Sequence, residues 1–101
     1  MSTPTEFEWD EHNIRKNWEK HKVAFSECEE VFFNEPLWVA KVDRSRIIYE
    51  ESRYLAYGTT NAKRLLLAVF TLRGDKIRVI SVRDMNRKER RFYQEETKKA
   101  R

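Results

Sequence analysis

Three apolar runs in the second half of the chain lie only a few residues apart, and this spacing restricts the fold more than any other feature. RYLAYG at 53–58, RLLLAVFTL at 64–72 and KIRVISVR at 76–83 are all suited to strands. The tripeptide RGD joins the last two runs, so they turn back on each other as antiparallel neighbours. We therefore expect an antiparallel meander over 53–83.

The first helix is expected just after a short strand near the N-terminus. FEW at 7–9 alternates aromatic and polar residues, as a strand with one apolar face does. Asp10 then suits the N-cap of a helix over 11–21. Ile14 and Trp18 are four residues apart and would form its narrow apolar stripe.

A second helix is expected over about 26–34. Ser26 and Glu29 have the S-x-x-E spacing of a capping box, and Pro36 closes the helix. LWVAKV at 37–42 then predicts a strand, followed by a turn or loop at DRSR.

The last helix is expected over 87–98. Asn86 and Glu89 repeat the capping pattern in a weaker form. Helices placed against an antiparallel sheet make an α+β fold, and a chain of 101 residues suffices for one domain, 1–101.

Composition limits the setting in which such a domain works. Cys28 is the only cysteine, so an internal disulfide is impossible, and no Cys/His cluster has zinc-ligand spacing. No apolar run has the length of a membrane span, and the N-terminus lacks the pattern of a signal peptide. We expect a cytoplasmic protein without membrane contact, metal or cofactor.

Charge is divided unevenly along the chain. Residues 1–62 contain 8 Lys+Arg and 12 Asp+Glu, a net charge of −4, whereas residues 63–101 contain 13 and 5, a net charge of +8. A basic half of this kind attracts nucleic acid or an acidic protein partner. A solvated charged surface is the plainer interpretation, and the asymmetry alone does not decide between them.

The exit of the last strand is the first candidate site. Strict alternation in KIRVISVR places Arg83 at the end of an apolar row that includes Ile77 and Val79, with Arg78 on the opposite face. A guanidinium held by a strand offers a planar fork for phosphate oxygens. An Arg paired with a carboxylate at the sheet edge is the other possibility.

The last helix and the end of the first helix supply further candidates. Glu89 and Tyr93 are four residues apart with Arg90 beside them, on a helix too poor in apolar residues to bury much surface. The last helix therefore either binds a protein partner or a polyanion, or it is a solvated helix that is stabilised by ion pairs. Lys20 and His21 end the first helix, where a histidine interacts favourably with the helix dipole or, alternatively, transfers protons near neutral pH.

These residue types are those that RNA cleavage by the 2′-hydroxyl requires. A base removes the 2′-OH proton, cations stabilise the crowded phosphorane, and an acid protonates the leaving 5′ oxygen. A chain with this many charged residues would contain bases, acids and cations by chance. The residues alone therefore indicate only an α+β domain with a basic C-terminal half.

Several stretches, in order and spacing, resemble the BrnT family of toxins from bacterial toxin–antitoxin pairs, which are small RelE-like ribonucleases. The resembling stretches cover nearly the whole chain: FEWD at 7–10, KH at 20–21, VAF at 23–25, VFF at 31–33, RYLAYG at 53–58, RLLLAVFTLRGDKIRVIS at 64–81, and R-x-x-N-x-x-ERRFY ending at Tyr93. The C-terminal block is the most specific.

Three departures from the family pattern stand out. Lys22 replaces the usual Gly after KH, and Met85-Asn86 replaces the usual Ala-Thr or Ala-Ser. DRSRIIYEESR at 43–53 lacks a histidine that the family often has there, which leaves His21 as the more probable imidazole if one is used.

The resemblance implies a RelE-like antiparallel sheet with two N-terminal helices and a C-terminal helix, and an activity that cleaves RNA and halts translation and growth. It also implies a cognate BrnA-like antitoxin with a ribbon-helix-helix DNA-binding domain, which covers the basic surface and carries the complex to DNA.

The leading hypothesis is therefore a metal-independent endoribonuclease toxin. Arg83 and Arg53 would clamp phosphate, and Lys20, His21 and Glu89 are the candidates for proton transfer. RNA would be held by Arg78, Arg90 and Tyr93, the last by stacking on a base. The rivals are a noncatalytic module that binds nucleic acid or an acidic protein, and a structural subunit whose last helix is ordered only in a complex.

Overall fold

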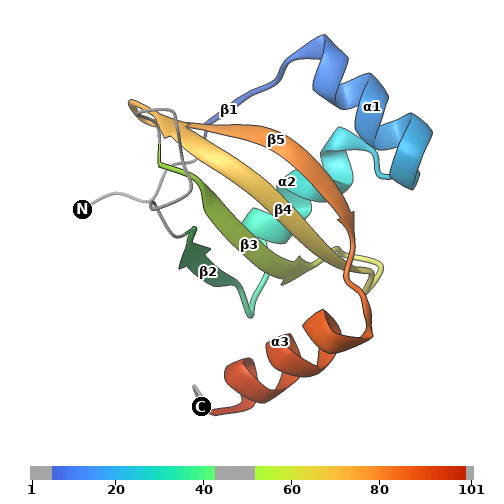
Figure 1. Cartoon of the computed structure of the whole chain (residues 1–101), viewed down its shortest axis with the longest axis vertical. Helices are drawn as coiled ribbons and strands as arrows, with labels where there is room; N and C mark the ends of the chain where they lie inside the picture. Colours follow the sequence, from blue (N-terminus) through green and yellow to red (C-terminus); the bar gives the residue numbers. More distant parts are fainter. Residues whose placement is uncertain (1–5, 43–51, 100–101) are drawn as a thin grey trace.

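A computed structural model, which describes residues 6–42 and 52–99, contains a five-stranded sheet and three helices in those ranges (Figure 1). The elements in chain order are β1 (Glu6–Glu8), α1 (Glu11–His21), α2 (Phe25–Phe33), β2 (Trp38–Lys41), β3 (Tyr54–Thr59), β4 (Leu65–Arg73), β5 (Lys76–Asp84) and α3 (Arg87–Lys99). The predicted turn at DRSR lies outside the described residues. The expected α+β class is confirmed.

The sheet has the strand order β1-β5-β4-β3-β2. The predicted meander is confirmed, because β3, β4 and β5 pair antiparallel in turn, and β2 adds antiparallel to β3. The short β1 instead pairs parallel with the first residues of β5, with Phe7 opposite Ile77. The expected antiparallel sheet is thus confirmed for β2 to β5, and β1 adds one parallel edge, which makes the whole sheet mixed.

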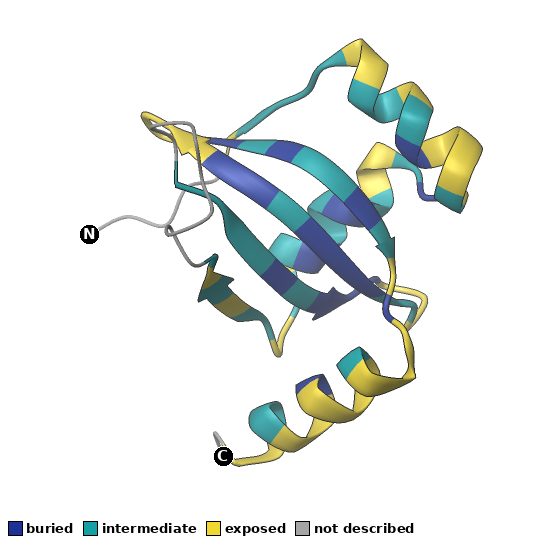
Figure 2. Ribbon diagram, in the orientation of Figure 1, coloured by how far each residue is buried: buried dark blue, intermediate teal, exposed yellow. Residues whose placement is uncertain are grey.

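The two faces of the sheet are covered differently, and this positions the candidate site. Helix α2 packs across one face, here called the α2 face, where Val31 and Cys28 join Leu66, Ala68 and Val79 in the main core. Helix α3 covers only one end of the opposite face, here called the α3 face. Figure 2 shows α3 as mostly exposed, in contrast to the buried centre of β4 and β5.

Helix α1 begins and ends as predicted, but it packs through polar rather than apolar residues. Asp10 caps it by accepting a hydrogen bond from the His12 N–H at 2.8 Å. Trp18 is 51% exposed, whereas Asn17 is buried and accepts a hydrogen bond from the Val82 N–H at 3.2 Å. Backbone groups on the β5 edge beyond β1 need partners, and α1 side chains supply them. The predicted Ile14–Trp18 stripe is therefore wrong.

Helix α2 starts one residue before the predicted range and is capped by a different glutamate. Glu27 Oε1 accepts the Ala24 N–H at 3.0 Å, so Glu27 holds the position that we assigned to Glu29. Glu29 instead accepts a hydrogen bond from Trp9 Nε1 at 2.8 Å. The predicted Ser26–Glu29 capping box is wrong because a tertiary partner recruits Glu29.

One extra residue in β5 changes the face on which its arginine lies. Val69 pairs with Ser81 and Phe70 with Val79, so Ile80 has no partner of its own in β4. Such a bulge reverses the alternation, and Val79 and Val82 both enter the core. Arg83, which pairs with Leu67, therefore lies on the α3 face, and the prediction that it ends the apolar row is wrong.

None of the described helices is long and apolar enough to cross a membrane.

Candidate functional site

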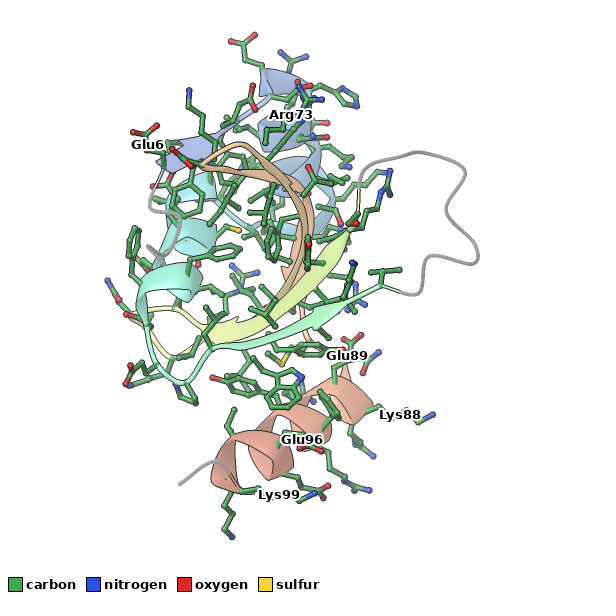
Figure 3. The ribbon with its side chains drawn as sticks, turned by 90° about the vertical axis from the view of Figure 1, so that its left-hand side faces the viewer. Glu6, Arg73, Lys88, Glu89, Glu96 and Lys99 are labelled. Atoms are coloured by element: carbon green, nitrogen blue, oxygen red, sulfur yellow. The ribbon has the colours of Figure 1, made fainter. Side chains whose placement is uncertain are left out.

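The end of β5 carries an arginine that is locked to the first turn of α3. Arg83 Nη1 and Nη2 donate to Glu89 Oε1 and Oε2, each at 2.8 Å, in a two-point ion pair. The Arg83 side chain remains 40% exposed, whereas that of Glu89 is only 18% exposed. Figure 3 shows Glu89 at the end of α3 nearest the sheet. The guanidinium is thus held in one orientation with part of its surface open to solvent.

The predicted cap of α3 fixes the carboxylate of this pair. Glu89 Oε1 accepts the Asn86 N–H at 2.8 Å, and Asn86 Oδ1 accepts the Glu89 N–H at 2.8 Å, so the reciprocal capping box is confirmed. Hydrogen bonding from Arg83, followed by that from the Asn86 backbone, holds the pKa of Glu89 below its ordinary value. Glu89 is therefore ionised at neutral pH in this arrangement.

Tyr57 of β3 completes this side of the site. Tyr57 pairs with Leu67 and Leu67 with Arg83, so all three side chains share the α3 face. The Tyr57 ring lies 5.3 Å from the Phe92 ring, centroid to centroid. Burial first, and the negative charge of Glu89 second, raise the pKa of Tyr57, so its phenol stays protonated near neutral pH.

A second arginine network lies beside the first. Arg64 Nε and Nη2 donate to the two carboxylate oxygens of Asp84 at 2.7 and 2.9 Å, and Nη1 contacts Glu27 at 3.1 Å. The same guanidinium donates to the carbonyls of Lys22 and His21 at 2.9 and 3.0 Å. Arg64 therefore joins the end of β5 to the segment between α1 and α2.

Two further charged groups act on Asp84 at the end of β5. The pKa of Asp84 is lowered chiefly by its hydrogen bonds from Arg64, and the nearby charges of His21 and Arg90 lower it further. Lys20 and His21 form the last turn of α1, where cations are favoured by the helix dipole. Asp84 at the end of β5 thus has Arg64 as a bonded partner and His21 and Arg90 among its charged neighbours.

The residue after His21 keeps the turn that the family pattern forms with glycine. Lys22 has φ 55° and ψ 40°, the left-handed conformation that glycine adopts most easily, and its N–H bonds to the Asn17 and Trp18 carbonyls. Its Nζ lies 5.5 Å from the centre of the Trp18 ring. The departure from the family at Lys22 therefore leaves the C-cap of α1 intact.

A family model for the ribonuclease toxin BrnT of type II toxin–antitoxin systems matches residues 9–89. The chain belongs to the BrnT family. Its fold is similar to the 1.1 Å crystal structure of the Brucella abortus ribonuclease toxin BrnT, with a TM-score of 0.62 and 22% sequence identity over 81% of this chain and 97% of that one. No curated protein matches the sequence.

Family membership settles the class of function. This BrnT protein is a ribonuclease toxin whose substrate is RNA and whose partner is a neutralising antitoxin. The matched range includes the Arg83–Glu89 pair and ends there, so the greater part of α3 lies beyond it.

Two of the predicted site residues lie away from the end of β5. Arg78 pairs with Asp10 at 3.6 Å, and its β4 partner Thr71 is four residues from Leu67, which places it ~13 Å along the sheet from Arg83. Arg53 directly precedes β3, towards the same end of the sheet as Arg78, and its carbonyl accepts the Val42 N–H. The bulge nevertheless puts Arg78 and Arg83 on one face, contrary to prediction.

The structure also changes the interpretation of two residues on α3. Tyr93 is only 4% exposed and donates its hydroxyl hydrogen bond to the Pro36 carbonyl at 2.5 Å, so its ring anchors α3 and is not available to stack on a base. Arg90 is exposed and donates to the Met85 carbonyl at 3.2 Å. The stacking role expected for Tyr93 is therefore withdrawn.

Sequence reasoning missed Tyr57, Arg64 and Asp84. Tyr57 shares a face of β3 with Leu55, but nothing in the local sequence shows that this face meets Arg83. In the described part of the chain, no three His, Cys, Asp or Glu side chains form a group that could bind a metal ion. The metal independence of the reaction stays a prediction.

Proposed function

We propose that this BrnT toxin cleaves RNA at the end of β5, by attack of a 2′-hydroxyl on the adjacent phosphate and without a metal ion. The observation that carries the proposal is the forked Arg83–Glu89 pair at the end of β5, next in sequence to Asp84, on which the charge of His21 acts. Arg90 adds positive charge beside them. This set supplies phosphate binding and proton transfer within a single site.

Arg83 is the proposed phosphate clamp. Its two terminal nitrogens are already arranged as a fork by Glu89, and a phosphate offers the same two-oxygen geometry. A phosphate that displaces Glu89 would release a carboxylate beside the reacting group. Glu89 freed from Arg83 regains a higher pKa and becomes a better base for the 2′-hydroxyl proton.

The remaining predicted residues are assigned to binding and proton transfer around this point. His21 is the second candidate for proton transfer, with Lys20 and Arg90 stabilising phosphate charge. Arg78 and Arg53, ~13 Å away along the strands, would bind phosphates further along the same RNA. Tyr93 has only a structural role here.

The decisive experiment is an RNA cleavage assay in excess chelator. Wild-type protein should cleave, and Arg83→Ala and His21→Ala should each slow cleavage by about 10²-fold, the usual contribution of a proton-transfer or oxyanion-binding group. Arg91→Ala, which removes an exposed arginine of α3, is the matched control and should cleave normally. Full cleavage by both test variants would remove these residues from the mechanism.

A noncatalytic binding surface is the second candidate, and the closed Arg83–Glu89 pair favours it. If this pair serves only to fasten α3 to β5, the basic face would bind RNA or an acidic protein without cleaving either. In that case this surface binds RNA in a salt-sensitive manner while cleavage takes place elsewhere, and Arg83→Ala should weaken RNA binding without abolishing growth arrest. Growth arrest that Arg83→Ala abolishes would exclude it.

For the antitoxin we propose a BrnA-like protein with a ribbon-helix-helix DNA-binding domain. Its toxin-binding part would be acidic and would cover Arg83 and Arg90, so that RNA and antitoxin exclude each other. The toxin would contact DNA only through this complex, in the cytoplasm. Purified complex should cleave no RNA, and complex that still cleaves at the free-toxin rate would contradict occlusion.

A further inference from the structure

We propose that Tyr57 is a catalytic residue that donates a proton to the leaving 5′ oxygen of the RNA. The assignment rests on the proposed function, since it concerns the same site at the end of β5. The proposed site at the end of β5 has several candidates for proton transfer but no assigned general acid, and Tyr57 supplies that acid.

Strand register brings Tyr57 and Arg83 to the same place. Tyr57 on β3 and Arg83 on β5 both pair with Leu67 of the strand between them, so they point from one face on either side of a single leucine. Their Cα atoms are two strand spacings apart, ~10 Å, and the side chains of a tyrosine and an arginine are long enough to reach a common point between them. A phosphate held by Arg83 would therefore lie beside the Tyr57 hydroxyl.

The ring of Tyr57 is held firmly, and its hydroxyl is left for a ligand. Phe92 packs on the ring at 5.3 Å and itself lies edge-on to Trp38 at 5.9 Å, so α3 and β2 both fix the ring plane. Within residues 6–42 and 52–99, no hydrogen-bond partner is present for the Tyr57 hydroxyl. A half-buried phenol that is fixed in position and has no internal partner suits a bound phosphate ester.

The electrostatic surroundings keep the proton on this phenol until it is needed. Burial and the Glu89 charge raise the pKa of Tyr57, whereas Arg83 acts in the opposite direction. Arg83 would also stabilise the phenolate that forms when the proton leaves.

The proposed reaction is a transesterification of the phosphodiester. Glu89 or His21 takes the 2′-hydroxyl proton, the O2′–P bond forms, and the P–O5′ bond breaks with its electron pair moving to O5′. The Tyr57 proton passes to O5′, which gives a 2′,3′-cyclic phosphate and a 5′-hydroxyl end. Solvent then returns a proton to the phenolate and takes one from the base.

The test compares Tyr57→Phe with wild type on two RNAs, one normal and one with sulfur in place of the leaving 5′ oxygen. The variant keeps the ring against Phe92 and loses only the hydroxyl. It should cleave normal RNA about 10²-fold more slowly. It should cleave the 5′-thio RNA at nearly the wild-type rate, because a thiolate leaves without protonation.

Tyr54→Phe is the matched control, since Tyr54 lies on the same strand but stacks on Phe70 at the opposite face. It should behave as wild type with both RNAs. Equal slowing of Tyr57→Phe on both substrates, or no slowing on either, would overturn the assignment while leaving RNA cleavage established. Wild-type protein that cleaves neither RNA would refute the proposed function, and the assignment with it.

Discussion

Replacement of Arg64 by alanine should clearly destabilise this protein. The Arg64 side chain is 27% exposed and donates to Asp84, Glu27 and two main-chain carbonyls. These bonds join β5 to α2 and to the turn after α1. Their loss would loosen three elements at once and release the segment that carries His21.

The expected loss follows from the exposure of each partner. Asp84 is 57% exposed, so its ion pair contributes about 0.5 kcal/mol. Glu27 is 29% exposed and contributes about 1 kcal/mol, and the two carbonyls contribute about 0.5 to 1 kcal/mol each. The free energy of unfolding should thus fall by about 2.5–3.5 kcal/mol, and Tm by about 10–25 °C.

Urea unfolding followed by tryptophan fluorescence measures this change. Arg64→Lys retains one charged donor but not the fork, so it should lie between wild type and alanine. Arg91→Ala should change the free energy of unfolding by less than 0.5 kcal/mol, as is usual for an exposed site. A loss below about 1 kcal/mol in Arg64→Ala would refute the view that this network fastens the elements together.

Three further substitutions test the Arg83–Glu89 ion pair, the packing of α2 against β3 and the cap of α3. Glu89→Gln should make the free energy of unfolding depend less on pH in the acid range. In the wild type the Arg83 ion pair contributes fully above the ordinary Glu pKa of 4.5, and this contribution is lost as pH falls through the lowered pKa of the folded state. Unfolding of both proteins between pH 3 and 7 measures this, and identical curves would argue against the pair. Gly58→Ala should cost about 1–3 kcal/mol in urea unfolding, because its Cβ would lie 2.6 Å from Val31 Cγ1; a neutral change would mean that α2 shifts freely. Asn86→Ala should cost about 1 kcal/mol in thermal unfolding through loss of the α3 cap, and an unchanged Tm would show that the cap is dispensable.

Features encoded by neighbouring residues were predictable from the sequence. The strands of the meander, the Asp10 cap and the Asn86–Glu89 capping box all depend on residues within a few positions of each other. The cap of α2 was misassigned because two glutamates had suitable positions, and distant partners decided between them. Trp9 engages Glu29, which leaves Glu27 for the cap.

The candidate site was predictable in its parts but not in its assembly. The sequence identified Arg83 and Glu89 separately, yet their ion pair depends on the bulge at Ile80, which has no glycine or proline to mark it. Tyr57 was hidden for a related reason, since its neighbour across the sheet is set by the register of two strand pairs. Tyr93 suited a surface role on helix spacing alone, and only the packing of α3 against Pro36 shows that it is buried.

The chemical ends of the RNA fragments show whether the 2′-hydroxyl is the group that attacks the phosphate. Incubation of a labelled RNA with the purified toxin in excess chelator should yield 2′,3′-cyclic phosphate and 5′-hydroxyl ends, and a single 2′-deoxy substitution at the cleaved position should abolish cleavage there. Fragments with 3′-hydroxyl and 5′-phosphate ends, or cleavage that continues past the 2′-deoxy substitution, would show that water rather than the 2′-hydroxyl attacks the phosphate. Either result would contradict the mechanism placed at Arg83, Glu89 and Tyr57.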